Sequence, residues 1–152
     1  MKIKIFALTH KKFEVPQDKM YQPLQVGREE KEDLGYLCDN TGDNISAENC
    51  YYSELTGLYW IWKNVHTYKY VGTCHYRRYL LNEQEKIFTE AEYLELLKDY
   101  DLITTKRVVL NNSYHYGFAT NHNIHALDMT GEVIKELYPE YYDTFVQLVN
   151  GT

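Results

Sequence analysis

Residues 68–79 read YKYVGTCHYRRY, an apolar run that leads without a break into a basic tetrad. The run from Tyr68 to Cys74 predicts a short β-strand. The tetrad that follows it comprises His75, Tyr76, Arg77 and Arg78. Two adjacent guanidinium groups at the end of a buried strand are costly unless an anion or carboxylates neutralise them. The stretch therefore predicts a strand whose carboxyl end meets a negative charge.

Strands and helices alternate on both sides of this run. Residues 2–8 alternate and then become apolar, which predicts the first strand. Ser53 predicts the N-cap of a helix that ends at Asn64 and carries Leu55, Leu58, Tyr59 and Trp62 on one face. A capping box at residues 89–92 predicts a helix to about Tyr100 that buries Tyr93, Leu94 and Leu97.

The rest of the chain is less regular. Residues 101–105 predict another strand, and Pro139 predicts the first turn of a last helix that runs to Val149. Residues 121–137 predict a helix that buries Ile124, Leu127, Ile134 and Leu137. The segment from Pro16 to Asn49 has little periodicity, so we expect a long, loop-rich excursion that is functional or contains short elements without a sequence signal. Together these elements predict an α/β fold with a mixed, largely parallel sheet flanked by helices, in one domain over residues 1–152.

Composition limits the function classes. A chain of 152 residues suffices for one continuous core, and its net charge of −6 argues against non-specific nucleic-acid binding. Residues 55–82 and 102–127 contain no acidic side chain, although both windows contain basic ones. In an acidic protein, such windows favour an anion site. The three cysteines are too widely spaced for a disulfide framework or a zinc site.

Basic residues follow the predicted strands at three places: residues 9–12, 74–78 and 105–107. Ligands of open α/β sheets bind beyond the carboxyl ends of the strands, so we expect phosphate there. Arg77 and Arg78 are suited to grip it in bidentate forks. If the chain stays extended, His75 and Arg77 share one face of it. The alternative is that the arginines form structural salt bridges with the acidic segment around Asp39 and Asp43.

That acidic segment is the second candidate for chemistry. Residues 39–46 read DNTGDNIS, which lacks the ligand alternation of a calcium loop. Asp39, Asp43 and Asn44 could accept hydrogen bonds from ribose or sugar hydroxyls. A plain tight turn at Gly42 is the alternative.

The third candidate is a group of histidines in the second acid-free window: His115, His122 and His125, with Asp128 nearby. Two histidines three residues apart on a helix can share a metal, which leaves a metal-dependent phosphoesterase as an alternative function. No third ligand of suitable spacing occurs on the same element. We therefore expect no metal. Instead, we expect one histidine, paired with Asp128 or a tyrosine, to bind substrate or to stabilise the start of the helix.

Short motifs in a fixed order extend through nearly the whole chain. They are THKK at 9–12, QVG at 25–27, EDLGYL at 32–37, TGDNIS at 41–46, ELTGLYW at 54–60, GTCHYRRY at 72–79, YHY at 114–116, His122 followed by Asp128, and YPEY at 138–141. In this order they resemble a family of bacterial exopolysaccharide and capsule glycosyltransferases catalogued as domain of unknown function 4422. The resemblance implies a hexosyltransferase that uses a nucleotide sugar and has a GT-A-like (nucleotide-diphospho-sugar transferase-like) fold.

The resemblance also implies roles for individual residues. Many enzymes of that fold hold a divalent metal on an aspartate-rich motif after a central strand, and the basic tetrad occupies the corresponding place here. We therefore expect the arginines to replace the metal, with no cofactor and with activity that survives EDTA. The expected catalytic residues are His75, Arg77 and Arg78. The expected donor contacts are Thr9, His10, Lys11, Asp39, Asp43, Asn44 and Tyr76, and the expected acceptor or sugar contacts are His115, His122 and Asp128.

The expected partners are a nucleotide-sugar donor and a lipid-linked or oligosaccharide acceptor, with no nucleic acid. We expect no transmembrane segment and a cytoplasmic location that allows peripheral contact with the inner face of the cell membrane. The family pattern continues beyond Thr152, so we expect the C-terminal portion of the family domain to be missing. A non-catalytic nucleotide- or glycan-binding module is therefore the main alternative.

Overall fold

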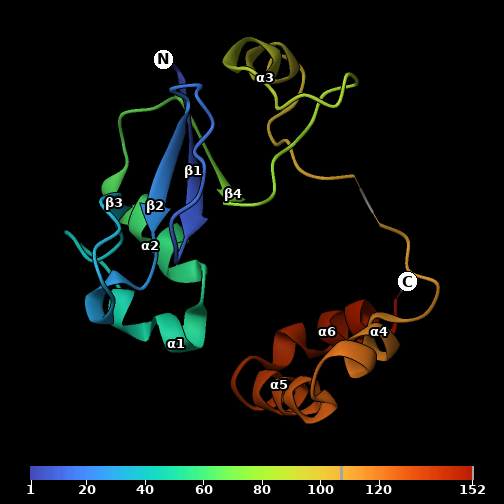
Figure 1. Ribbon diagram of the computed structural model, residues 1–152. Helices are drawn as coiled ribbons and strands as arrows, with labels where there is room; N and C mark the ends of the chain where they lie inside the picture. The colour runs from blue at the N-terminus through green and yellow to red at the C-terminus, as the bar shows by residue number, and fades with distance from the viewer. Residues whose placement is uncertain (107, 152) are drawn as a thin grey trace. The chain divides into compact units, whose positions relative to one another are not determined.

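The computed structural model describes residues 1–106 and 108–151. The chain divides into two compact units, Met1–Thr104 and Thr105–Thr152. The first unit contains a parallel sheet with helices and the second contains helices (Figure 1). The predicted α/β class is confirmed, whereas the single domain over residues 1–152 stays a prediction.

The sheet of the first unit has four parallel strands in the order β3-β2-β1-β4. These strands are β1 (Ile3–Thr9), β2 (Tyr21–Gln25), β3 (Leu37–Cys38) and β4 (Tyr70–His75). The chain moves outward from β1 to β3 and then crosses back to place β4 on the other side of β1. The strand order therefore reverses between β1 and β4, which is the point where open α/β sheets bind their ligands.

Side chains of β1 alternate between the two faces of the sheet, as the strand period requires. Phe6 and Leu8 pack on one face against Trp60 and Ile61 of α2 (Leu55–Asn64). Ile3 and Ile5 pack on the other face in a cluster with Tyr93 of α3 (Glu90–Leu96). The central strand is thus buried from both sides, so the predicted first strand is confirmed.

The capping box predicted for α3 is present. Thr89 accepts a hydrogen bond from the backbone N–H of Glu92, and the Glu92 carboxylate accepts one from the backbone N–H of Thr89. The helix ends at Leu96, four residues before the predicted end, although the turns that follow it continue to Asp99. Tyr93 is buried, whereas Leu94 is partly buried.

The helix predicted after Ser53 exists, but its buried face is not the predicted one. Trp60 and Ile61 are buried, together with Thr56 and Gly57, whereas Leu55, Leu58 and Trp62 are exposed. Ser53 is not the N-cap either, because that position belongs to Glu54. The predicted buried face is wrong because the helix faces the sheet with Thr56 and Gly57, which are small enough to let it approach closely.

Gly57 of α2 packs directly against residues at the ends of β1 and β2, and replacing it tests this packing. A Cβ atom there would lie 2.7 Å from Val26 Cγ1 and 3.0 Å from Leu8 Cδ2. Gly57→Ala should therefore lower the free energy of unfolding of the first unit by roughly 1–2 kcal/mol, despite the better helix propensity of alanine. Gly117→Ala is the control, because no atom lies within 4 Å of its added Cβ. Urea denaturation should show that this variant gains roughly 0.5–1 kcal/mol, and a gain at Gly57 would contradict the close packing.

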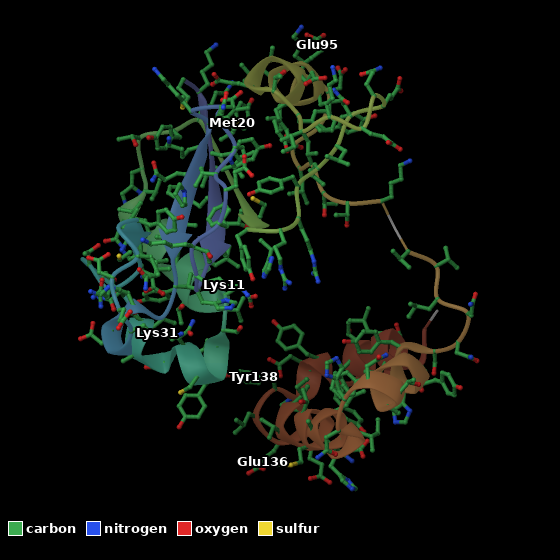
Figure 2. The ribbon with its side chains drawn as sticks, viewed as in Figure 1. Lys11, Met20, Lys31, Glu95, Glu136 and Tyr138 are labelled. Carbon is green, nitrogen blue, oxygen red and sulfur yellow. The ribbon has the colours of Figure 1, made fainter. Side chains whose placement is uncertain are left out.

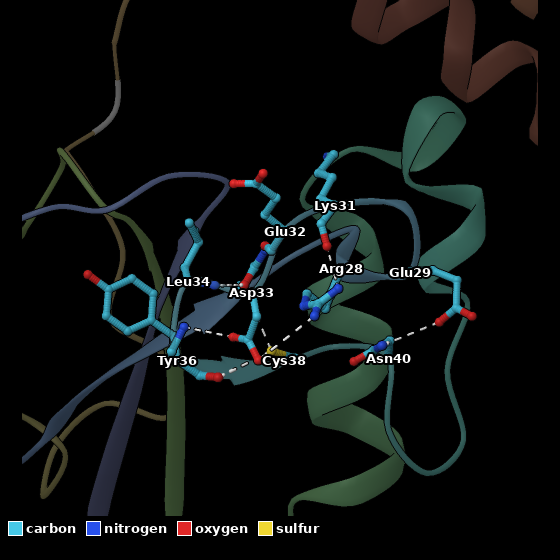
Figure 3. Close-up of polar contacts among 11 residues, drawn as sticks. Arg28, Glu29, Lys31, Glu32, Asp33, Leu34, Tyr36, Cys38 and Asn40 are labelled. Carbon is cyan, nitrogen blue, oxygen red and sulfur yellow. Dashed lines mark hydrogen bonds and ion pairs between the residues drawn. The ribbon is translucent and has the colours of Figure 1, made fainter.

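The segment from Pro16 to Asn49 is rich in loops, as predicted, and it also contains short elements. It contains β2 and β3, the 3₁₀ turns η1 (Arg28–Glu30) and η2 (Ser46–Glu48), and the start of α1 (Asn49–Tyr52). The buried Gln25 side chain ties this segment together, since it donates to the Glu32 carbonyl and accepts from the Leu34 N–H. Figure 3 shows further local contacts, among them the Arg28–Asp33 ion pair.

The strand predicted at residues 101–105 is wrong, because the chain is irregular there. Residues 101–104 line a cavity of about 520 Å³ beside β4 and α3 instead of pairing with β4. Most of its lining is apolar, and Lys69 is the basic residue among the lining side chains. His75, Arg77 and Arg78 are not among the residues that line this cavity.

The second unit contains α4 (Tyr114–Asn121), α5 (Ile124–Leu137), the turn η3 (Pro139–Tyr141) and α6 (Tyr142–Asn150). The predicted helices at residues 121–137 and 139–149 correspond to α5 and to η3 with α6, whereas α4 was not predicted. Leu127 of α5 is buried, but Leu137 is exposed, so its predicted burial is wrong. Within the residues that the structure describes, no helix is long and apolar enough to cross a membrane.

Candidate functional site

The basic tetrad forms a tight turn at the carboxyl end of β4. The Arg78 N–H donates to the His75 carbonyl over 2.8 Å, and the Tyr76 N–H donates to the Leu8 carbonyl of β1 over 3.1 Å. Tyr76 and Arg77 are therefore the central residues of the turn. The extended chain considered for this stretch is wrong, because strand pairing ends at His75 and the backbone reverses.

Tyr76 anchors this turn. Its side chain is buried, and its ring packs against those of His75, His10 and Phe13 at centroid distances of 4.4, 5.6 and 5.6 Å. Lys11 Nζ lies 5.7 Å and Arg77 Cζ 5.1 Å from the ring centroid, within cation–π range. The ring thus joins the ends of β1 and β4 and holds two cations near each other.

Arg77 and Arg78 are exposed, and neither forms an ion pair with a described residue. The acidic groups considered as their partners are engaged elsewhere. Asp43 Oδ2 lies 4.0 Å from Lys63 Nζ, and Asp39 is completely buried among other donors. Salt bridges from the arginines to this acidic segment are therefore absent over residues 1–106 and 108–151, and both guanidiniums are open to an external anion.

His75, the first residue of this turn, carries a hydrogen-bond donor. Its Nδ1 accepts from the Arg77 backbone N–H over 3.3 Å, which assigns the remaining proton to Nε2. Partial burial, followed by the charge of Arg77, lowers the pKa of the His75 imidazole below its ordinary value, and Glu54 opposes this shift. The ring is therefore neutral at pH 7 and can donate one hydrogen bond from Nε2.

A cavity of about 210 Å³ lies next to this turn, at the point where the strand order reverses. Thr9 and His10 line it from the end of β1, and His75 lines it from the end of β4. The residues that complete the lining are Leu8, Val26, Lys31, Asn49, Ser53 and Glu54. Figure 2 shows Lys11 and Lys31 on the carboxyl side of the strands. Two of the three predicted basic strand ends thus meet at one site.

The far wall of the cavity contains a strained residue. Ser53 has φ 50° and ψ −128°, a conformation that costs a non-glycine residue about 1–3 kcal/mol. Its carbonyl accepts hydrogen bonds from Asn49 Nδ2 at 2.7 Å and from the Thr56 backbone N–H at 3.3 Å, which hold the backbone in place. Its hydroxyl donates to Glu54 Oε2 at 2.7 Å. Sequence patterns missed Ser53 because backbone strain leaves no signal in residue types.

Asp39 was predicted to contact the sugar donor, but it lies inside the protein. There it organises the loops behind this wall of the cavity. Its carboxylate accepts from the N–H groups of Gly27 and Arg28 and from the hydroxyls of Ser46 and Thr56, over 2.6–3.1 Å. Its side chain has no exposed surface. This geometry favours a structural role for Asp39 over contact with a sugar hydroxyl.

Asp43 and Asn44 were also predicted to contact the sugar donor. They lie at the opposite end of α2 from the cavity. Asp43 accepts from the Tyr59 hydroxyl and exchanges backbone hydrogen bonds with the Asn64 side chain. Asn44 closes its own turn by bonding the Gly42 carbonyl and the Ser46 N–H. Since α2 has ten residues, its two ends are about 15 Å apart. The structure therefore does not bring these two residues together with Thr9, His10 and Lys11.

The candidate acceptor contacts belong to the second unit. His115 Nε2 lies 3.9 Å from Asp128 Oδ1, and both line a cavity of about 370 Å³. His122 instead packs on the ring of Phe118, 4.8 Å between centroids. In the described part of the chain, no three His, Cys, Asp or Glu side chains gather as a metal site would require. Arg107, at the third predicted basic strand end, lies outside the described residues.

Similarity to known proteins identifies the family of this chain. None of the curated proteins matches the chain. Among solved structures, the apo structure of the bifunctional glycosyltransferase WbbM is similar over the full length of this chain, with a TM-score of 0.80 and 27% sequence identity. The chain spans 32% of that protein, and the likeness supports a glycosyltransferase-like role. Residues 4–152 match the model of a domain of unknown function, DUF4422, and the chain therefore belongs to that family.

Proposed function

We propose that the chain moves a hexosyl group from a nucleotide-diphosphate sugar onto an acceptor of a bacterial surface polysaccharide. The observation that carries this proposal is the pair of exposed guanidiniums, Arg77 and Arg78, on a buried aromatic anchor where the strand order reverses. Neither guanidinium has an acidic partner among the described residues. The similarity to WbbM supports the class of reaction.

The chemistry of the site follows from where charge develops. When the bond between the anomeric carbon and the diphosphate oxygen breaks, negative charge collects on the departing diphosphate. Arg77 and Arg78 stabilise this charge with bidentate hydrogen bonds, as a divalent metal does in other transferases. The neutral His75 ring donates from Nε2 to the diphosphate or to the leaving oxygen.

The nucleoside end of the donor binds at the end of β1. Thr9 and His10 line the cavity there, and Lys11 and Tyr76 lie beside them. Thr9 Oγ1 also bonds the Lys11 backbone, at 2.5 Å to its carbonyl and 3.1 Å from its N–H, which fixes the turn after β1. The acceptor is lipid-linked or an oligosaccharide, with contacts from His115, His122 and Asp128, and the reaction takes place at the cytoplasmic face of the membrane.

A binding and transfer experiment tests the proposal. Isothermal titration with a panel of nucleotide sugars should find at least one that binds, and incubation of that donor with acceptor should release the nucleoside diphosphate. Addition of EDTA should leave the rate of release within about 2-fold, because guanidiniums rather than a metal hold the diphosphate. Binding with neither transfer nor hydrolysis would favour the non-catalytic module. A requirement for added divalent ions would refute the role of the arginines.

A further inference from the structure

Glu54 is a carboxylate whose side-chain contacts do not match a helix-capping role. It occupies the N-cap position of α2, yet its side chain makes no capping hydrogen bond to that helix. Its Oε2 accepts from the Ser53 hydroxyl, and the backbone N–H of Glu54 itself also interacts with the carboxylate, which leaves lone pairs on the two oxygens unused. Glu54 also lines the cavity between the ends of β1 and β4. Part of the acceptor capacity of this carboxylate is therefore left for a ligand.

The cavity lies beyond the carboxyl ends of the strands, where open α/β sheets bind their ligands. Leu8, Thr9 and His10 bound it at the end of β1, and Val26 follows the end of β2. His75 forms its border toward the basic turn of Arg77 and Arg78. A volume of about 210 Å³ lies below the roughly 300–1,000 Å³ of pockets for drug-sized ligands, so it suits one ring of a donor rather than the whole molecule.

We propose that Glu54 recognises the ribose of the donor, with its carboxylate accepting hydrogen bonds from the vicinal 2′- and 3′-hydroxyls. This inference rests on the proposed function, because it requires the diphosphate to lie on Arg77 and Arg78. A carboxylate directly against the diphosphate would repel it, whereas one ribose ring between them separates the two charges. Lys31 lines the same cavity, and its positive charge reduces the repulsion further.

Ser53 acts as the positioning residue for this carboxylate. Its hydroxyl hydrogen bond is the largest cause that lowers the pKa of the Glu54 carboxyl below its ordinary value, so the group stays ionised and acceptor-only at neutral pH. The hydrogen bonds from Asn49 and Thr56 hold Ser53 in its strained conformation. Strain that the surrounding structure maintains next to a cavity is a frequent feature of ligand sites.

The test measures discrimination between ribose and dideoxyribose. The full chain is titrated with uridine, cytidine, adenosine and guanosine diphosphates, and then with the 2′,3′-dideoxy form of the one that binds most tightly, which lacks both hydroxyls. Glu54→Gln should weaken the binding of the ribonucleotide about 10-fold to 100-fold, which corresponds to one charge-assisted hydrogen bond. It should change the affinity for the dideoxynucleotide by less than about 3-fold. Glu48→Gln removes the same charge from an exposed residue outside the cavity and should change neither affinity.

A second variant keeps the inference testable if Glu54→Gln does not fold. Ser53→Gly removes the orienting hydroxyl and suits the positive φ, so it should raise thermal stability and reduce the preference for ribose. Equal weakening of the ribo- and dideoxynucleotide by Glu54→Gln would overturn the assignment, as would a loss of transfer rate with unchanged diphosphate affinity. Failure of all four diphosphates to bind the wild type would instead refute the proposed function itself.

Discussion

Replacing both Arg77 and Arg78 by alanine should weaken the binding of a nucleoside diphosphate by roughly 100-fold or more. The affinity for the free nucleoside should fall by less than about 3-fold. Both guanidiniums are exposed beside His75, and no described carboxylate holds them. They can therefore turn to the diphosphate without breaking an internal ion pair. Isothermal titration of the two ligands against the double variant measures the difference directly.

Lys69→Ala is the matched control for this variant. Lys69 immediately precedes β4, at the opposite end of the strand from the basic turn. Its replacement also removes a positive charge, but the affinity for the diphosphate should stay within about 2-fold because the charge is distant from the site. Equal losses of diphosphate and nucleoside in the arginine double variant would mean that the pair supports the fold and not the ligand.

The sequence predicted those elements whose signal is local. The apolar runs of β1 and β4 and the capping box of α3 depend on neighbouring residues, and the structure contains all three. β2 was missed because Pro23 interrupts its pattern. The prediction of a strand at residues 101–105 was wrong because this segment pairs with no strand of the sheet. A strand-like pattern forms a strand only where an edge pairs with it.

The candidate site was predictable only in part. His10 and Lys11 meet His75 and Arg77 because parallel strands bring their carboxyl ends to one edge, a rule that can be applied to the sequence. The predicted acidic contacts were less reliable, because residue type does not distinguish a buried carboxylate from an exposed one. Asp39 and Asp43 are four residues apart, yet the first is completely buried and the second exposed. Glu54 lines the cavity instead.

Asp39→Ala should lower the free energy of unfolding of the first unit by about 3–5 kcal/mol, because it leaves several buried donors without an acceptor. Those donors are the N–H groups of Gly27 and Arg28 and the hydroxyls of Ser46 and Thr56. The Thr56 backbone N–H also bonds the Ser53 carbonyl, so the variant should disturb the wall of the cavity as well. Urea denaturation of the full chain provides the measurement.

Asp43→Ala provides the comparison that separates structure from ligand binding. Asp43 is exposed and its ion pair with Lys63 is long, so its loss should cost at most about 1 kcal/mol. Neither variant should change diphosphate affinity by direct contact, because Asp39 is enclosed and Asp43 lies at the far end of α2. If Asp39→Ala kept its stability and yet lost affinity for the ribonucleotide, the aspartate would be a donor ligand. The ribose contact would then have to be shared between Asp39 and Glu54.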